Sequence, residues 1–430
     1  MLAALNADYA WPPRNPPVTG TSLTLYAHRR RKASLTDTEV RAALAPPSPA
    51  VGGGRTGLAA GLISLLALAS PPATAGWLDG FIDPDDGQFD MSEWLLDRKG
   101  FLPVPIIITE PAVGYGGGLA ALFFRESIRE ASADAVEAGR YRPPDIYALG
   151  GAHTENGTWL GFAGGMVGFA NDQYRWRGGI ARMSVNLDFY GPGGKLGPVR
   201  YNLDGWGSVQ HGMIRLGQSD AWLVLRWNYA DLTNRFDNES SAAQFGPIVR
   251  NSTASALGIS LEVDTRDNLF TPSRGWTGSI DATFADPDWG SDTRFQTYRA
   301  HAFGYWPIGK TIILGGRIDG RAAEGDVPFY ILPFVDLRGV PAARLQDKRT
   351  GVLETEVRWN VTPRWAAIGF VGAGRAWGTF SDFSDGTGTV AKGVGFRYLI
   401  ARRLGVYAGM DFAWSTQDKA FYIQVGNAWR

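Results

Sequence analysis

The sequence predicts an all-β protein, a transmembrane antiparallel β-barrel of about sixteen strands with a long extracellular loop folded into it. Glycine, at 56 residues, and aromatic residues, at 12%, are both abundant. No segment after residue 76 has the roughly 20 apolar residues that a membrane-spanning helix requires. Instead, apolar and polar positions alternate over segments of roughly ten residues, which is the pattern of tilted strands that cross a bilayer.

Charge and composition exclude several classes of protein. The chain has 42 basic and 42 acidic residues, so its net charge does not favour a nucleic-acid partner. Cysteine is absent, which excludes disulfides and thiolate metal sites. The four histidines do not cluster with other ligand residues, so neither a metal nor a cofactor is expected.

The first part of the chain carries a targeting pattern. An apolar run at residues 57–70 follows Arg55 and leads to small residues that end at Ala75. This pattern predicts a secretory signal peptide, for which a buried helix is the alternative. The residues upstream lack periodicity, so we expect them to be disordered or to reflect a mis-annotated start. The predicted division is 1–54 for this upstream segment, 55–75 for the signal peptide, 76–102 for a periplasmic lead-in and 103–430 for the barrel.

Turn lengths predict which end of the barrel faces the periplasm. When strands are counted from residue 104, short and long connections fall on opposite sides of the sheet. Bacterial barrels have short periplasmic turns and longer extracellular loops, so both chain ends are expected in the periplasm. A soluble β-sandwich is the alternative, but its apolar strand faces would promote aggregation in water. The short connections are 217–220, 307–310, 362–364 and 401–403; the long ones are 237–250, 325–350 and 378–390, and the charged segment 125–144 is a long exception on the periplasmic side.

The longest connection, residues 325–351, contains Leu337, Arg338, Gly339 and Val340 in succession. Alternating segments precede and follow it, so it joins two strands. It is too long for a hairpin turn and is rich in proline and apolar residues, which is typical of a functional loop. We therefore expect it to fold back into the barrel, with Arg338 as its anchor.

A second motif lies at a strand end. Asp264, Arg266 and Asp267 form an Asp-x-Arg-Asp sequence, and Phe-x-Pro-x-x-Gly follows with Pro272 and Gly275. Proline and glycine favour turns, and the charges are suited to ion pairs. We expect a turn with an ion-pair network at the periplasmic rim.

These two motifs resemble those of the bacterial surface antigen superfamily, the BamA/TamA-like outer-membrane barrels. The resemblance covers residue 104 to the C-terminus and implies sixteen strands in the bacterial outer membrane. It implies that Arg338 and Gly339 anchor the loop in the lumen through Glu356. It also implies a C-terminal signal for the barrel-assembly machinery, which would comprise Phe421, Ile423, Val425 and Trp429.

The sequence departs from the family pattern at several positions. Val340 replaces an aromatic residue, and Gly372 stands where the family usually has an Asp. We therefore expect Arg338 to have fewer partners than its family counterparts. Arg430 follows the terminal aromatic Trp429. We also expect the chain to lack the POTRA domains through which family members engage their clients, because the segment before the predicted barrel is short.

The expected function is that of an outer-membrane protein that is not an enzyme. The resemblance implies a role in membrane biogenesis or in protein or lipid transport, through a weak seam between strands 104–109 and 421–429. Outer-membrane lipids are expected partners, and the client is not defined. A passive pore or structural barrel plugged by residues 325–350 is one alternative. A hydrolase that uses lumenal His211 or His301 is another, although neither has a serine that completes a recognisable nucleophile motif.

Overall fold

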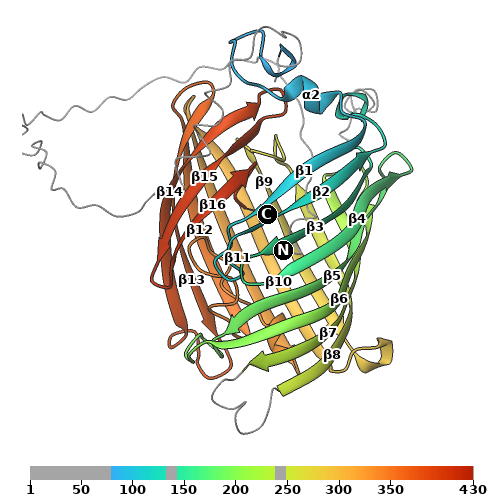
Figure 1. Ribbon diagram of the computed structural model, residues 1–430, viewed down its shortest axis with the longest axis vertical. Coiled ribbons are helices and arrows are strands. Elements are labelled where there is room, and N and C mark those ends of the chain that lie inside the picture. The colour runs from blue at the N-terminus through green and yellow to red at the C-terminus, as the bar shows by residue number, and fades with distance from the viewer. Residues whose placement is uncertain (1–78, 132–142, 238–247, 430) are drawn as a thin grey trace, which may run out of the picture. The chain divides into compact units, whose positions relative to one another are not determined.

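The computed structural model describes residues 79–131, 143–237 and 248–429. Within these ranges, sixteen antiparallel strands form one sheet in which each strand pairs with the next along the chain, and Figure 1 shows that the sheet curls into a barrel. The expected segments 1–54 and 55–75, and the middle of the 125–144 segment, lie outside the described residues. The strands are β1 Gly100–Ile108, β2 Gly116–Phe124, β3 Ile146–Thr154, β4 Trp159–Phe169, β5 Tyr174–Phe189, β6 Val199–Arg215, β7 Ala221–Asp237, β8 Ile248–Asp264, β9 Gly275–Ala285, β10 Phe295–Ile308, β11 Ile312–Gly325, β12 Arg349–Asn360, β13 Trp365–Trp377, β14 Thr387–Ala401, β15 Val406–Ser415 and β16 Lys419–Val425.

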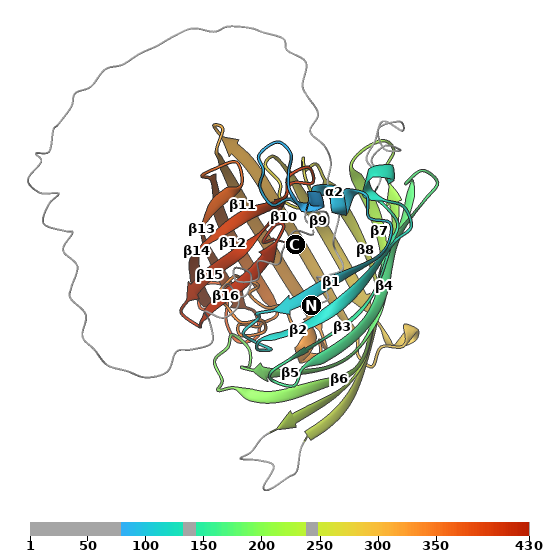
Figure 2. The ribbon, with the colours of Figure 1, turned by 45° about the horizontal axis from the view of Figure 1, so that its top comes forward.

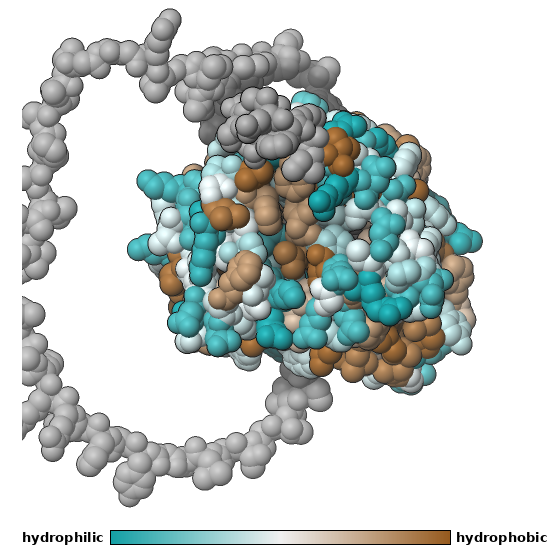
Figure 3. Space-filling model, turned by 90° about the horizontal axis from the view of Figure 1, so that it is seen from below, coloured by the Kyte–Doolittle hydropathy of each residue, from teal (hydrophilic) through white to brown (hydrophobic). Residues whose placement is uncertain are grey.

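Alternation along each strand separates the two faces of the wall. On β12, Glu354 is buried inside the barrel, whereas the neighbouring Leu353 is 60% exposed on the outside. Trp276, Trp306 and Trp365 are likewise exposed on the exterior. Such an exterior matches the lipid-facing belt of a membrane barrel, and the predicted fold class is confirmed. Figure 3 views the barrel from the end opposite helix α2 (Ser92–Leu96). Hydrophilic residues predominate on this end of the barrel, and hydrophobic residues lie at the edge of the end surface.

Helices contribute little to the described part of the chain. The elements are α2 (Ser92–Leu96) and three short 3-10 helices, η2 (Asp79–Phe81), η3 (Pro287–Trp289) and η4 (Phe329–Ile331). No helix among the described residues has the length and apolar character needed to span a membrane.

Both ends of the sheet differ from the sequence-based expectation. The first strand begins at Gly100, three residues before the predicted barrel start at residue 103. The last strand ends at Val425, so the expected strand at 421–429 was too long. Gly426 explains the early end because its φ of 78° turns the backbone out of the sheet. Its N–H donates to the carbonyl of Tyr407 at 2.7 Å.

A seam separates the first and last strands. The hydrogen-bonded order runs from β1 to β16, and no pairing between these two strands closes it in the described residues. Figures 1 and 2 show the two strands on the same side of the barrel. Pro103 and Pro105 both lie in β1, and proline cannot donate to a neighbouring strand. The sequence of β1 is therefore that of an edge strand.

The N-terminal lead-in packs across the end of this seam. Trp94 and Leu95 of α2 contact a buried apolar cluster that joins Leu102 and Phe124, from β1 and β2, to Leu404 in the β14–β15 turn. This is the end that turn lengths predict to be periplasmic, and Figure 1 shows α2 beside it. The lead-in therefore contacts elements from both sides of the seam.

Two arginines hold the lead-in by its carboxylates. Arg364, in the β12–β13 turn, is 1% exposed and donates to Asp83 and Asp90 at 2.5 Å each and to Asp86 at 2.6 Å. Arg402 donates to Asp83 at 2.6 Å. Hydrogen bonds from Arg402, and then from the backbone of the lead-in, lower the pKa of Asp83 to about 2. Sequence reasoning missed this network, because its partners lie far apart in the chain.

Acidification should therefore release the lead-in only in strong acid. A lowered folded-state pKa gives stability that is present above the ordinary carboxyl range and lost as the pH falls through about 2. We expect pepsin to spare residues 80–98 near about pH 4 and to cut them near about pH 2. Arg402→Ala removes the largest cause of the shift and should move the onset of cleavage to higher pH. Equal onsets in the two proteins would refute this account.

Candidate functional site

The connection between β11 and β12, residues 326–348, returns into the barrel. Its apolar side chains form a buried cluster with residues of the inner wall. This packing excludes water from the base of the loop and leaves its charged side chains in a confined, partly dry interior. The cluster consists of Val335, Leu337, Val340 and Leu345 from the loop and Val352, Ala376 and Ala391 from the wall.

Arg338 occupies the centre of these lumenal contacts. Its guanidinium donates to Glu354 Oε1 at 2.7 Å and to Asp411 Oδ2 at 2.9 Å. It also forms an ion pair with Glu356 Oε2 at 2.7 Å. The guanidinium carbon lies 3.6 Å from the centre of the Phe370 ring, within cation–π range. Both Glu354 and Asp411 are fully buried, so the pairing with Arg338 offsets the cost of keeping these charges out of water.

Two further arginines balance the charge around Arg338. Arg397 of β14 donates to both carboxylate oxygens of Asp411, at 2.7 and 2.9 Å. Arg317 of β11 lies 3.6 Å from Glu354. Three arginines therefore face three carboxylates. We call this group of six charged residues the lumenal lock; it consists of Arg317, Arg338, Arg397, Glu354, Glu356 and Asp411.

Arg338 does not depend on Glu356 alone, because Glu354 and Asp411 also contact it. Gly372 lacks the expected carboxylate, but a β-carbon there would lie 2.6 Å from Leu337 of the loop. The glycine thus makes room for the loop, and Asp411 from β15 supplies a carboxylate instead. Two sequence features could have indicated this. Glu354 shares a strand face with Glu356, and Asp411 is the one charged residue in the segment 404–414.

The tip of the loop contacts both sides of the seam. The Gly339 N–H donates to the Tyr422 hydroxyl on β16 at 2.9 Å. The Ala342 N–H donates to Glu110 in the β1–β2 turn, also at 2.9 Å. Gly339 has a φ of 87°, and a β-carbon there would lie 3.1 Å from Ala413. Glycine is therefore required where the loop approaches the last two strands.

Trp429 also differs from its expected position. The resemblance places it in the last strand with Phe421, Ile423 and Val425, but only those three lie in β16. Beyond Gly426 the chain enters the lumen, where Trp429 is 3% exposed. Its indole N–H donates to Glu354 Oε2 at 2.8 Å, so the C-terminal segment contacts the lumenal lock directly.

The predicted turn motif forms a compact turn between β8 and β9. Arg266 donates to both oxygens of Asp264, at 2.8 and 2.5 Å. The Asp267 carboxylate accepts from two backbone N–H groups of the same turn, at 2.9 and 3.1 Å. The Pro272 carbonyl accepts from Arg358 of β12 at 2.9 Å, and Gly275 has a φ of 92°. These contacts hold the turn against the inner wall.

A serine lies next to one of the two lumenal histidines. Ser279 Oγ is 3.2 Å from His301 Nδ1. However, the Ser279 hydroxyl donates to Asp281 at 2.8 Å, so His301 can only donate to it. This is the reverse of the arrangement that activates a serine nucleophile. No group of three or more potential metal-binding side chains occurs among the described residues.

The barrel, its seam and its in-folded loop define a class of outer-membrane protein with sixteen strands. A family model described as the Omp85 superfamily domain matches residues 213–336, which include the turn motif and end two residues before Arg338. The predicted resemblance to BamA-like outer-membrane barrels is therefore confirmed. No curated protein sequence matches the chain.

Two solved structures have a similar fold. BamA from Haemophilus ducreyi lacking POTRA domains 1–3 has 11% sequence identity and a TM-score of 0.54, over 76% of this chain and 70% of that chain. CdiB from Escherichia coli has 9% identity and a TM-score of 0.53, over 75% of this chain. This chain covers 61% of that CdiB chain. At these identities the likeness concerns the fold.

We expect Arg338→Ala to free the loop. Removing one partner of a buried ion pair typically costs about 3–5 kcal/mol, because the remaining charges stay buried without compensation. The variant should unfold at lower denaturant concentration and expose residues 326–348 to trypsin. Arg344→Ala is the matched control, since this loop arginine contacts the neutral Gly194 carbonyl at 3.1 Å. Equal losses in the two variants would exclude a special role for Arg338.

Substitutions at Trp429 should separate packing from hydrogen bonding. Trp429→Phe keeps a ring but leaves a buried Glu354 oxygen without its donor, at a cost of about 1–3 kcal/mol. Trp429→Ala also opens a cavity, for a total of about 3–5 kcal/mol. The denaturation midpoint of protein refolded in detergent measures both effects. If Trp429 acts only as an assembly signal, refolded variants will match wild type and only their insertion in cells will fall.

Proposed function

We propose that this protein is an outer-membrane assembly or transport barrel that works by lateral opening of the β1–β16 seam. The unpaired seam is the observation that carries the proposal. Unpaired strand edges present backbone donors and acceptors that another strand can use. Proline at two positions of β1 weakens direct closure with β16, so a separate segment can compete for either edge.

Contacts that involve side chains hold the two edges of the seam together, because no backbone pairing joins β1 to β16 in the described part of the chain. Tyr115 and Phe421 stack across the seam with ring centres 5.4 Å apart. The loop tip joins Tyr422 to Glu110. Each contact is worth about 1 kcal/mol, so opening is energetically feasible without unfolding the wall. BamA and CdiB share the fold, and their likeness is compatible with this role.

A seam cross-link should block this activity. The chain has no cysteine, so Tyr115→Cys/Phe421→Cys introduces one defined pair for a short, reducible thiol linker. We expect the linked protein in vesicles to lose any acceleration of folding of an added outer-membrane barrel, and reduction to restore it. Phe101→Cys/Phe123→Cys is the control, because these rings lie 5.5 Å apart on the hydrogen-bonded strands β1 and β2. Full activity of the cross-linked seam would overturn the proposal.

A pore plugged by residues 326–348 is the second candidate, and the lumenal position of the loop favours it. A plugged pore opens when the loop leaves, whatever the state of the seam. Conductance in planar bilayers should then rise in Arg338→Ala and stay high when the seam is cross-linked. Unchanged conductance in Arg338→Ala would remove this candidate.

A further inference from the structure

One row of opposed residues crosses the exterior of the barrel from rim to rim. The register places Lys419 of β16 opposite Trp414 of β15, and Trp414 opposite Lys392 of β14. All three side chains are exposed and lie on the outer face, because the alternate positions Asp411 and Ala413 are buried inside. Directly opposed side chains have β-carbons about 5 Å apart, so the two lysines flank one indole.

The row begins at the predicted extracellular rim. Lys419 is the first residue of β16, and Trp414 is the next-to-last residue of β15. Tryptophan is enriched at membrane interfaces, where lysine also reaches the headgroup region. Neither lysine has an ion-pair partner within the described residues. Two cations thus face the membrane interface without a protein counterion.

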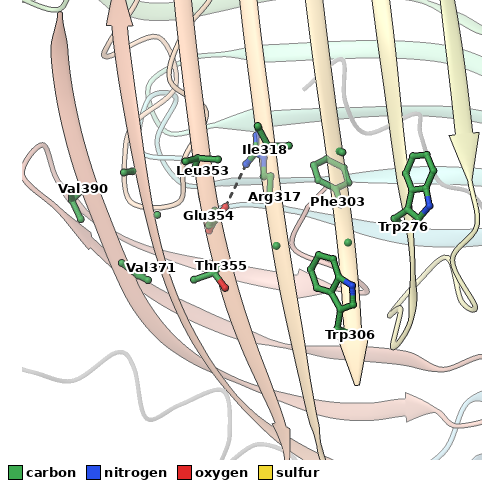
Figure 4. Close-up of a pocket in the computed structure, with 15 residues that line it drawn as sticks. Trp276, Phe303, Trp306, Arg317, Ile318, Leu353, Glu354, Thr355, Val371 and Val390 are labelled. Atoms are coloured by element: carbon green, nitrogen blue, oxygen red, sulfur yellow. Dashed lines mark ion pairs between the residues drawn. The ribbon is translucent and has the colours of Figure 1, made fainter. Parts of the chain in front are cut away.

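Beyond Lys392 the row becomes an apolar trough. It continues through Val371, Thr355, Gly316 and Gly304, each opposite the next, and reaches Trp276 near the other rim. The small residues at its centre leave a cavity of about 610 Å³ on the outer wall. Figure 4 shows Ile318 and Leu353 on one side of the trough and Trp306 on the other.

The trough has the dimensions of a lipid chain. Strands lie about 4.8 Å apart, so the five steps from Lys392 to Trp276 span roughly 24 Å. The strands of membrane barrels tilt by about 35–45°, so this path rises about 15 Å along the barrel axis, which is about half of a hydrocarbon core about 30 Å thick. Most of the lining is apolar and faces outward, so a hydrocarbon chain fits the trough. The lysines at one end favour a negatively charged headgroup.

We propose that Lys392, Trp414 and Lys419 bind the phosphate group of an anionic membrane lipid, one acyl chain of which lies in the trough. The site places the headgroup of an ordered lipid on β14–β16, directly beside the seam. The proposed lipid site requires only that the outer face of the barrel wall contacts the membrane. It does not depend on whether the seam opens, so its test can fail while the proposed lateral opening stands.

Native mass spectrometry of the detergent-solubilised protein with added phosphatidylglycerol tests the headgroup site. Each interfacial lysine contributes about a five-fold factor, so Lys392→Gln/Lys419→Gln should weaken binding roughly thirty-fold. Lys195→Gln is the matched control, because this exposed lysine lies in the β5–β6 loop, away from the row. Heat-modifiable gel mobility verifies that each variant is folded. Equal binding by wild type and the double variant, or an equal loss in the control, would overturn the site.

Two further binding measurements distinguish a lipid from a free ion as the ligand. Ala373→Leu fills the trough and leaves both lysines in place, so it should weaken phosphatidylglycerol binding on its own. Phosphatidylcholine should bind more weakly than phosphatidylglycerol, and inorganic phosphate should not compete at concentrations that match the lipid. Effective competition by inorganic phosphate would show an ion site instead of a lipid site, and an unaffected Ala373→Leu would remove the trough from the proposal.

Discussion

The pairing of Arg338 with three carboxylates is the constraint on which the arrangement of the lumen depends. A buried guanidinium is tolerable only where carboxylates surround it, and here they come from β12 and β15. The loop cannot move without leaving these buried charges unpaired. The strands cannot change register without carrying the carboxylates away from Arg338. Loop position and barrel geometry therefore fix one another, while the glycines of β13 provide the space for contact.

Contacts at both ends of the seam connect the strands on its two sides. At one end the loop joins Tyr422 to Glu110, and at the other the lead-in packs on elements from both sides. Neither closure uses the backbone ladder that joins every other pair of neighbouring strands. The interactions that hold the seam are side-chain contacts that form and break singly, so the edges can separate while the other fifteen pairings persist. A rigid wall and the proposed opening of the seam are thus compatible in one sheet.

Sequence reasoning reached the strand count and the loop position, because each depends on local periodicity and on connection length. Arg338 and Glu356 lie close together as the resemblance implies. The partners Glu354 and Asp411 were missed, since inward-facing carboxylates on different strands cannot be ranked without the register. Arg364 and its carboxylates lie more than 270 residues apart, so no local pattern connects them. Trp429 was misplaced because a single glycine, Gly426, redirects the chain.

The inward course of residues 426–429 affects how the edge strand β16 is held. Trp429 follows β16 by four residues, and its indole donates to Glu354 of β12 inside the barrel. The strand β16 is therefore fixed twice, to β15 through its backbone and to β12 through the segment that follows it. Separation of β16 from β1 leaves both attachments in place, whereas withdrawal of residues 426–429 from the lumen leaves a buried carboxylate oxygen without its donor.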